Sequence, residues 1–229
     1  MNSQLKVFIG YDPKEDEAWN VCGFSLLRHA KSNVTIHPLK QSVLRELGLY
    51  TRDFDTGAST EFSISRFLTP YLNSNEGWVV FVDCDFLFTV DIKNVLKGLD
   101  DSKAVYVVKH DYTPSKTFKM DGAAQSIYPR KNWSSFMVFN CAHQDVKSLT
   151  PAIVNAASPK YLHRFEWVKD DNHIGELPLS WNFLEGEYEV PSNLPNAIHY
   201  TNGGPWFEDW QEVDFAEDWR KERNLMRES

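Results

Sequence analysis

The sequence predicts an α/β fold: one domain over residues 1–229, with a mixed, mostly parallel central sheet flanked by helices. Short apolar runs rich in Val, Ile and Phe alternate along the chain with segments whose apolar residues follow helical spacing. Such alternation is typical of sheets whose parallel strands are joined by helices. The chain has 229 residues, of which 42% are hydrophobic, so it can bury a sizeable core.

The first quarter of the chain predicts two strands and two helices. Residues 5–10 are an apolar strand that ends in the turn before Pro13, and residues 15–31 bring their apolar side chains to one face of a helix. Residues 34–39 predict a second strand, and a short helix follows within 40–50. A polar loop then continues to Thr60.

The middle of the chain predicts a further helix, three strands and a short helix. Residues 61–72 carry apolar side chains at helical spacing, and 79–88 form a nearly continuous apolar run, which is typical of a strand buried on both faces. Residues 92–99 follow as a helix. The runs 104–108 and 135–140 predict two more buried strands.

The last third is richer in Trp, Pro and Gly than the rest. Residues 165–171 and 177–182 are predicted to be ordered connections, and 197–200 a short strand. The last twenty residues, with three large aromatic side chains among acids and bases, predict a peripheral helix. No composition shift marks a domain boundary.

Composition excludes several classes of protein. A formal net charge of −8 argues against broad nucleic-acid binding, which needs a basic surface. No segment approaches the roughly 20 apolar residues of a transmembrane helix, and the N-terminus lacks the apolar core of a signal peptide. Cys22, Cys84 and Cys141 have no C-x-x-C spacing and stand in apolar surroundings. These features favour a cytoplasmic protein.

Two carboxylates interrupt the apolar run 79–88. Asp83 and Asp85 stand one residue apart, and an ionised Asp is costly to bury without a partner of opposite charge. A hard divalent cation suits an Asp-x-Asp pair, because such ions bind carboxylates together with substrate phosphates. The alternative is a strand that ends in a loop, where both side chains are solvated or cap the next helix.

Three other polar positions are candidates for ligand binding. Arg66 stands among apolar residues at helical spacing, and a buried guanidinium there needs an anion. A diphosphate or an adjacent carboxylate would supply the negative charge. The alternative is an Arg66 whose guanidinium reaches the solvent at the surface. Asp12 follows the first strand, and ligands of α/β sheets bind outside the carboxyl ends of strands. His199, at the end of the last strand, is either a metal ligand or an ordinary core or surface histidine.

The order of these features resembles a known family. An N-terminal strand ending in an acidic turn, an Arg-bearing helix, the Asp-x-Asp strand and a late His followed by Gly and Pro-Trp occur in that order in GT-A-type (Rossmann-like) nucleotide-sugar glycosyltransferases. The layout is closest to family 8, the glycogenin and lipopolysaccharide galactosyltransferase family. Residues 133–138 resemble the family's Asn-Ser-Gly-Val-Met-Val strand, and 177–182 resemble its Leu-Pro…Trp-Asn segment.

The resemblance implies a fold and an activity. It implies one GT-A domain, with residues 1–100 as the nucleotide-binding half and 101–229 as the acceptor-side half. The implied reaction transfers a hexose from a nucleotide-diphosphate sugar, with a UDP-sugar favoured, to an unidentified hydroxyl acceptor with retention of configuration.

The resemblance also implies roles for particular residues. Asp83, Asp85 and His199 would hold Mn²⁺ or Mg²⁺ at the diphosphate of the donor; the imidazole favours Mn²⁺. The implied donor-binding residues are Tyr11, Asp12, Arg66, Asp83, Gly203 and Gly204. Tyr11 and Asp12 would contact the base and ribose, although a plain turn before Pro13 is the alternative. Asp171, with Asp170 as second choice, would contact the sugar or acceptor; a solvated acidic turn is the alternative.

One position departs from the family pattern. The family usually has a Lys before the final Pro-Trp, where it binds the diphosphate, and here that position is Gly204. Backbone N–H groups of Gly203 and Gly204 could approach the anion instead. The charge could also come from the long polar segment 109–131, which we expect to be part of the donor or acceptor site. Its candidates are Lys109, Lys116, Lys119, Arg130 and Lys131.

Other functional classes share parts of this pattern. Phosphohydrolases of the haloacid-dehalogenase kind also have an Asp-x-Asp at a strand end, but theirs lies near the start of the chain, and Leu87 stands where they have Thr or Val. A non-catalytic nucleotide-sugar-binding relative is a second alternative. A nucleotidyltransferase is disfavoured, because no Gly-rich basic loop follows the first strand.

Overall fold

The computed structural model describes residues 4–31, 33–54, 59–111 and 129–229. Nine strands form two sheets in this part of the chain. The six-stranded central sheet consists of β1 (Leu5–Gly10), β2 (Val34–Leu39), β3 (Trp78–Val82), β5 (Val105–Val107), β6 (Phe136–Asn140) and β7 (Ile174–Glu176). The smaller sheet consists of β4 (Phe86–Phe88), β8 (Phe183–Leu184) and β9 (Ala197–His199).

The central sheet has the order β2-β1-β3-β6-β5-β7. β6 pairs antiparallel with β3 and β5, and the other pairs are parallel, so every strand except β6 runs in the same direction. The predicted mixed, mostly parallel sheet is therefore confirmed. The three strands of the first hundred residues lie on one side of the sheet and the three later strands on the other, and β3, where the two groups meet, has four fully buried residues.

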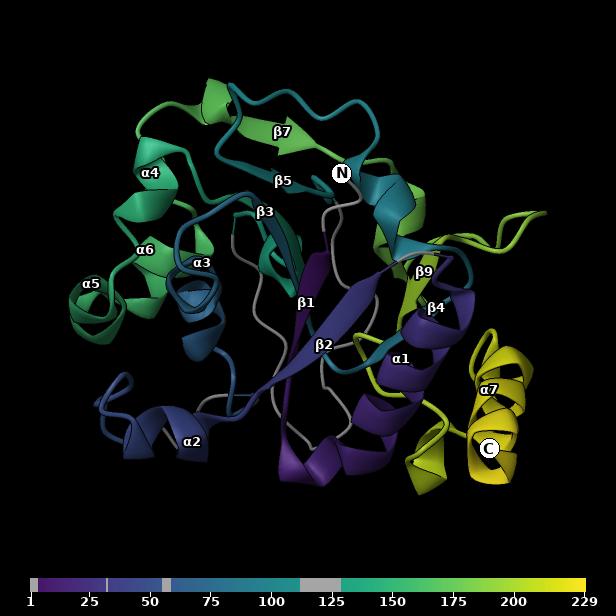
Figure 1. The fold of residues 1–229 in the computed structure, drawn as a ribbon. Helices are drawn as coiled ribbons and strands as arrows, with labels where there is room; N and C mark the ends of the chain where they lie inside the picture. Colours follow the sequence, from purple (N-terminus) through teal and green to yellow (C-terminus); the bar gives the residue numbers. More distant parts are fainter. Residues whose placement is uncertain (1–3, 32, 55–58, 112–128) are drawn as a thin grey trace.

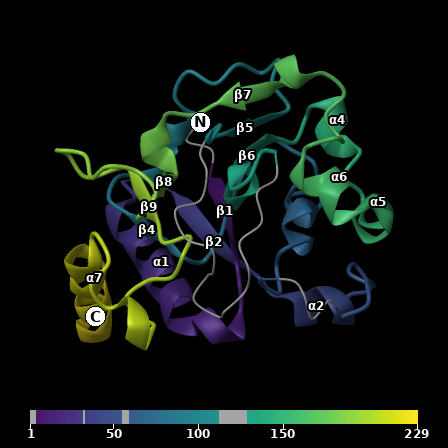
Figure 2. The same cartoon turned by 180° about the vertical axis from the view of Figure 1, so that it is seen from behind.

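Helices cover the sheet from two sides (Figures 1 and 2). α1, which follows β1, packs against β4 and α7, while α3, α4, α5 and α6 gather on the other side of the sheet. The α-helices are α1 (Asp16–His29), α2 (Gln41–Glu46), α3 (Thr69–Leu72), α4 (Gln144–Lys147), α5 (Pro151–Ala156), α6 (Pro159–His163) and α7 (Ala216–Glu228). The 3-10 helices are Pro13–Glu15, Ser65–Leu68, Ile92–Leu96, Trp133–Ser135, Asp171–His173, Leu179–Trp181 and Glu208–Trp210.

The predicted strand at 79–88 is wrong in one respect: the run forms two strands in two sheets. β3 ends at Val82 and β4 begins at Phe86, with the Asp-x-Asp in the turn between them. β3 pairs with β1 and β6, whereas β4 pairs only with β9. A turn at a sheet edge lets both carboxylates face one site, whereas a continuous buried strand would bury them in the core.

Two predicted helices are shorter than their apolar pattern suggested. Residues 61–72 contain a 3-10 helix at Ser65–Leu68 and the single turn of α3, with Pro70 in that turn. Residues 92–99 form a 3-10 helix that ends at Leu96, before Gly98 with its positive φ of 75°. Proline removes a backbone donor, and glycine favours left-handed backbone at the end of a helix, so both limit helix length.

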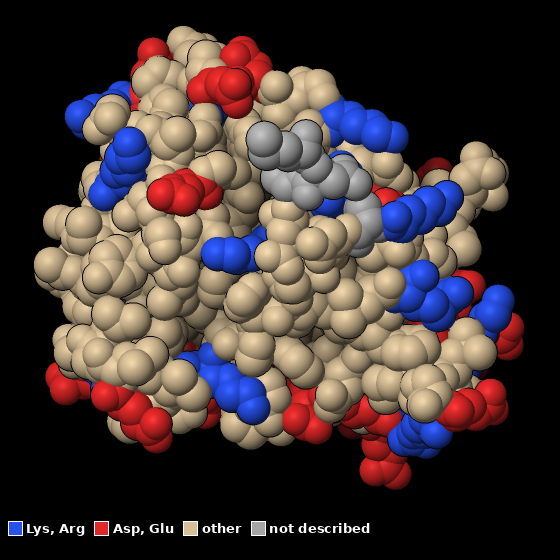
Figure 3. Space-filling model, viewed as in Figure 1, with Lys and Arg blue, Asp and Glu red and all other residues tan. Residues whose placement is uncertain are grey.

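Cys22, Cys84 and Cys141 are buried and free. In the described ranges, no helix combines the length and apolarity that crossing a bilayer requires. On the face shown in Figure 3, acidic and basic side chains are interspersed among uncharged ones.

Candidate active site

Asp83, Asp85 and His199 converge at the carboxyl end of β3. β4 pairs antiparallel with β9 so that His199 lies opposite Phe86, and the Tyr200 N–H donates to the Asp85 carbonyl at 3.0 Å. Potential ligand atoms of the three side chains lie within 4.8 Å of one another, and His199 Nε2 is 3.2 Å from Asp85 Oδ2. The two motifs that the sequence separates by more than a hundred residues thus form one cluster.

A buried hydrogen-bond network fixes the orientation of His199. Asn182, which directly precedes β8, uses its NH₂ group to donate to the Asn132 carbonyl at 3.2 Å and to Ser135 Oγ at 2.9 Å. Its Oδ1 therefore faces His199 Nδ1, at 2.9 Å, and accepts the proton of that nitrogen. Nε2 of the same ring faces Asp85. Phe86 stacks on the imidazole with ring centroids 4.4 Å apart and further restricts its rotation.

Arg66 is paired with one carboxylate of the cluster. Its Nη1 lies 2.7 Å from Asp83 Oδ1 and donates to the Ser134 carbonyl at 2.9 Å. The guanidinium is buried, and its carbon lies 5.2 and 5.1 Å from the ring centroids of Phe62 and Phe81. Among the anions considered for this Arg, an adjacent carboxylate is the partner in this structure.

Glu15 is an acid of this site that the sequence did not indicate. It is buried and lines the same small cavity as Asp83 and Asp85, and its Oε2 accepts a hydrogen bond from Cys84 Sγ at 3.5 Å. Burial, followed by the charge of Asp85, raises the pKa of Glu15 to about 8, so it is mainly protonated at neutral pH. In the sequence it is simply the first residue of an amphipathic helix, which is why it carried no signal.

The donor set fits a divalent cation. The cavity enclosed by the cluster has a volume of about 40 Å³, which suits one ion or water molecule but not a sugar. Two carboxylates and an imidazole whose Nε2 faces a carboxylate are ligands for Mn²⁺ or a similar ion. The hydrogen bond from His199 Nδ1 to Asn182 supplies the outer contact that holds a ligand histidine in one tautomer.

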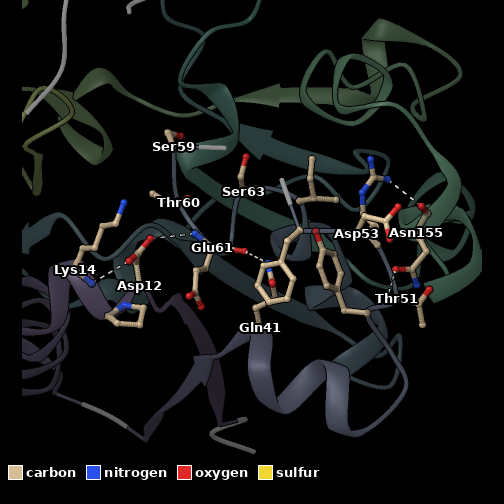
Figure 4. A pocket seen from close by; sticks show the side chains of 15 residues that line it. Asp12, Lys14, Gln41, Thr51, Asp53, Ser59, Thr60, Glu61, Ser63 and Asn155 are labelled. Atoms are coloured by element: carbon tan, nitrogen blue, oxygen red, sulfur yellow. Dashed lines mark hydrogen bonds between the residues drawn. The ribbon is translucent and has the colours of Figure 1, made fainter. Parts of the chain in front are cut away.

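A larger pocket adjoins this cavity and shares Ser59 and Thr60 with it (Figure 4). Its volume is about 840 Å³, within the range of small-molecule sites. Its lining residues come from the segments after β1 and β2, from the loop before α3 and from α5. They are Asp12, Pro13, Lys14, Gln41, Tyr50, Thr51, Arg52, Asp53, Phe54, Ser59, Thr60, Glu61, Ser63, Ile64 and Asn155.

Asp12 joins two walls of this pocket. Its Oδ1 accepts from the Lys14 N–H at 2.9 Å and its Oδ2 accepts from the Glu61 N–H at 3.1 Å. Figure 4 shows Asp12, Lys14 and Glu61 together at one end, with Gln41 near the middle. Tyr11 is oriented differently: its hydroxyl donates to Asp16 Oδ1 at 2.8 Å, and Lys40 Nζ lies 4.1 Å from its ring centroid.

The glycine pair near the C-terminus lies in a tight turn. The Gly203 N–H donates to the Tyr200 carbonyl at 2.9 Å, so this proposed phosphate donor is engaged within the protein. A Cβ on Gly204 would lie 2.0 Å from a ring carbon of Trp206. Glycine at 204 is therefore required by Trp206, a reason that the family comparison did not suggest.

Asp170 and Asp171 lie at the other edge of the central sheet. They precede β7, which runs parallel to β5, whereas the cluster follows the carboxyl end of β3. Asp170 accepts from the Asn172 N–H at 2.8 Å, and Asp171 forms an ion pair with Arg130 at 2.7 Å. The structure thus does not bring these two acids together with Asp83, Asp85 and His199.

Three of the five basic residues considered for binding the diphosphate lie in the described part of the chain. Arg130 pairs with Asp171, and Lys109 Nζ lies 5.9 Å from the ring centroid of Trp133. Lys131 is buried next to Asn132, which lines the small cavity. Lys116 and Lys119, with most of the segment 109–131, lie outside the described residues.

Comparison with solved structures identifies the fold as that of GT-A glycosyltransferases. The bifunctional glycosyltransferase WbbM matches 97% of this chain with a TM-score of 0.65 and 17% identity, and the glycosyltransferase GlyE of Streptococcus pneumoniae TIGR4 matches 99% with a TM-score of 0.64 and 15% identity. The chain spans 50% of WbbM and 63% of GlyE. The galactosyltransferase LgtC, solved with donor and acceptor sugar analogs, matches 96% with a TM-score of 0.56 and 11% identity, over 95% of its own length. The predicted GT-A fold is confirmed.

At the level of sequence, the chain belongs to the same family as Protein CDI of Arabidopsis thaliana. The two are 50% identical over 222 residues, which cover 95% of this chain and 85% of that protein. No protein-family model matches the chain.

Proposed function

We propose that this protein is a metal-dependent glycosyltransferase. It transfers a hexose from a nucleotide-diphosphate sugar, with UDP-hexose as the favoured donor, to a hydroxyl acceptor with retention of configuration. The observation that carries the proposal is the convergence of Asp83, Asp85 and His199 beside a pocket large enough for a nucleotide. The GT-A fold supports it independently.

Asp85 and His199, together with Asp83, are the residues that would hold Mn²⁺ or Mg²⁺. When bound, such an ion stabilises the negative charge that develops on the leaving diphosphate. Arg66 pairs with Asp83 at 2.7 Å, and His199 Nε2 lies 3.2 Å from Asp85 Oδ2. The positive charge of Arg66 repels a cation on its side of Asp83, so a position closer to Asp85 and His199 is favoured.

The larger pocket is the proposed site of the donor nucleoside. It opens at the carboxyl ends of β1 and β2, where ligands of α/β sheets bind, and it continues into the cavity of the Asp-x-Asp cluster through Ser59 and Thr60. Asp12 would act here by holding the backbone of Lys14 and Glu61 in place, because both of its oxygens already accept hydrogen bonds.

Donor binding can be tested by thermal unfolding with a panel of UDP-, GDP- and ADP-sugars, in Mn²⁺ and in EDTA. A donor that binds the native state raises the unfolding temperature by mass action, and we expect this only when the metal is present. Asp85→Ala and His199→Ala should each abolish the shift. Asp100→Ala, which changes an exposed carboxylate, is the matched control. Equal donor binding in EDTA would contradict the proposal.

A second assay separates this function from its rivals. A haloacid-dehalogenase-like phosphohydrolase would hydrolyse aryl phosphates with Mg²⁺ and form a beryllofluoride adduct on Asp83. A non-catalytic relative would bind the donor and release no nucleoside diphosphate with any acceptor. We expect neither phosphatase activity nor donor binding without turnover. Turnover of the donor should release the nucleoside diphosphate, and NMR should show that the sugar in the product keeps the anomeric configuration it had in the donor.

The acceptor-side role predicted for Asp170 and Asp171 is tested separately. Because these acids lie at the opposite edge of the sheet from the cluster, Asp171→Asn should leave metal-dependent donor binding unchanged. A lower turnover number with the natural acceptor would support the predicted role, and unchanged turnover would remove it.

A further inference from the structure

We propose that His143, Asp145 and His173 form a second metal site, which takes a Zn²⁺-like ion. Potential ligand atoms of these three side chains lie within 4.8 Å of one another. His143 and Asp145 stand at the start of α4, and His173 ends the 3-10 helix before β7. Figure 1 shows α4 beside the segment that leads into β7.

The site is separate from the Asp-x-Asp cluster. β6 runs antiparallel to β3, so the residues after β6 lie at the amino end of β3, and those before β7 lie at the same edge. The Asp-x-Asp follows the carboxyl end of β3. An ion held by His143, Asp145 and His173 therefore cannot contact the donor at Asp85.

The geometry brings two imidazoles to one carboxylate. His173 Nδ1 lies 2.9 Å and His143 Nδ1 3.9 Å from Asp145 Oδ2, and the two rings are arranged edge to face with centroids 4.7 Å apart. The Asp145 N–H donates to His143 Nδ1 at 3.2 Å, so this nitrogen carries a lone pair and no proton, and an ion bound there would replace this hydrogen bond. An ion bound at His173 Nδ1 would take the place of the proton on that nitrogen, and the ring would carry its proton on Nε2 instead.

The three side chains differ in burial. The Asp145 side chain is 3% exposed, His143 16% and His173 36%, so the carboxylate lies at the base and the imidazoles at the rim. The Lys169 N–H donates to Asp145 Oδ2 at 3.2 Å and holds the carboxylate in place. The exposed edge of His173 leaves a path for the ion and a position for a water ligand.

Backbone hydrogen bonds hold the two segments that carry the proposed ligands. The Ala104 N–H donates to the His173 carbonyl at 2.8 Å, and the His143 N–H donates to the Asn140 carbonyl at 3.0 Å. The ligands are therefore supported by the central sheet. A bound ion would tie α4 to the start of β7 and stabilise this edge of the sheet.

The ligand types separate the two sites chemically. Two imidazoles and one carboxylate are a common set for Zn²⁺ with an open fourth position, whereas the two carboxylates and one imidazole of the first cluster suit harder ions. We therefore expect Zn²⁺ and Co²⁺ to bind at His143, Asp145 and His173 more tightly than Mn²⁺ or Mg²⁺.

The test uses full-length protein without a histidine tag, in which Asp85→Ala and His199→Ala together remove the first cluster. Equilibrium dialysis with Zn²⁺ should retain one equivalent, and Co²⁺ should give the visible absorption of a four-coordinate ion. Adding His173→Gln should weaken Zn²⁺ binding at least tenfold and abolish the cobalt spectrum. His29→Gln, which changes a histidine on α1, should have no effect.

Two results would overturn the proposal: no Zn²⁺ retained by the double variant, or the same affinity after His173→Gln. Circular dichroism of the metal-free variants establishes that they are folded. If His173→Gln does not fold, His143→Gln replaces it in the same assay. Zn²⁺ should also raise the unfolding temperature of the double variant and leave that of the His-to-Gln variant unchanged.

Discussion

Asn182 donates both hydrogens of its amide, and its oxygen is left to accept from His199 Nδ1. One of the two acceptors is the Asn132 carbonyl, which can only accept a hydrogen bond. The amide nitrogen of Asn182 must therefore face it, and this determines the orientation of the amide. The Nδ1 of His199 is therefore held as the donor to Asn182, and Nε2 is directed at Asp85. Asn182, which does not touch Asp85, thus sets the orientation of the imidazole.

We expect Asn182→Ala to weaken Mn²⁺-dependent donor binding by about 10- to 100-fold, the usual cost of removing an outer partner of a metal ligand. The measurement is the donor dissociation constant by calorimetry at saturating and limiting Mn²⁺. The matched control is Asn196→Ala, because Asn196 donates to Ser180 and does not contact His199. An unchanged constant for Asn182→Ala would show that the tautomer does not matter.

The Arg66–Asp83 ion pair is buried, whereas Arg227–Glu17 is an ion pair at the surface. Arg66→Ala leaves a largely buried carboxylate without its cation, so we expect a loss of about 3 kcal/mol in the free energy of unfolding. Arg227→Ala should cost less than about 1 kcal/mol, because exposed pairs are screened by solvent. Urea unfolding of both variants checks this. Equal losses would mean that solvent reaches the Arg66 pair.

At the scale of elements, the turn after β9 is built around Trp206. Its ring lies over Gly204, in an edge-to-face arrangement with Tyr200 and 5.5 Å from the ring centroid of Trp219 on α7. This contact connects the turn that follows His199 to α7. A side chain at 204 would displace the indole and with it the support of the turn.

Gly204→Ala should therefore destabilise the protein by about 1–3 kcal/mol, the usual cost of overpacking. Gly204→Lys should do so too and should weaken donor binding, although it restores the family residue. Gly23→Ala is the control, and we expect it to stabilise the protein. Its Cβ would lie 3.4 Å from Ile36, which is an ordinary contact. Gly23 lies within α1, where alanine is favoured over glycine. Tighter donor binding by Gly204→Lys would show that the site simply lacks a charge.

Elements with a strong local pattern were predictable, and those defined by tertiary pairing were not. β1, β2 and α1 were predicted to within about two residues, because their spacing is regular. The division of the run 79–88 depends on β9 pairing with β4, which is invisible in the local sequence. β7 and β8 have three and two residues, too few for a periodic signal.

At the scale of the whole molecule, the candidate site combines residues from both halves of the chain. The Asp-x-Asp and Arg66 come from the first half, and His199 and Asn182 from the second. The sequence indicated Asp83 and Asp85 because they interrupt an apolar run, and His199 because it ends a strand before Gly and Pro-Trp, in the order of the family that the chain resembles. It did not indicate Glu15, whose role depends on burial beside Cys84, and it could not place Asp170 and Asp171, because the direction of β7 decides their edge of the sheet.

The pH dependence of stability is also a property of the whole fold. His163 lies at the end of α6, where its Nδ1 is 2.9 Å from Ser134 Oγ and its ring packs edge to face on Phe67. Burial, with a smaller effect of the Arg66 charge, lowers the pKa of His163 to about 3. An unfolded histidine has a pKa of about 6.5. Between these values the unfolded chain binds a proton that the folded protein does not.

The free energy of unfolding should therefore fall as the pH drops below about 6.5, because protons stabilise the unfolded chain, and the loss should continue towards pH 3. A group of this kind contributes at most about 1.4 kcal/mol per pH unit. Between pH 7 and pH 5, where few carboxylates titrate, we expect the wild type to lose about 1–2 kcal/mol more than His163→Gln, which keeps a polar partner for Ser134. Urea unfolding of both proteins at several pH values in EDTA measures the difference. If the unfolding free energies of the two proteins changed equally with pH, His163 would be protonated in the folded state. That result would contradict its burial beside Arg66.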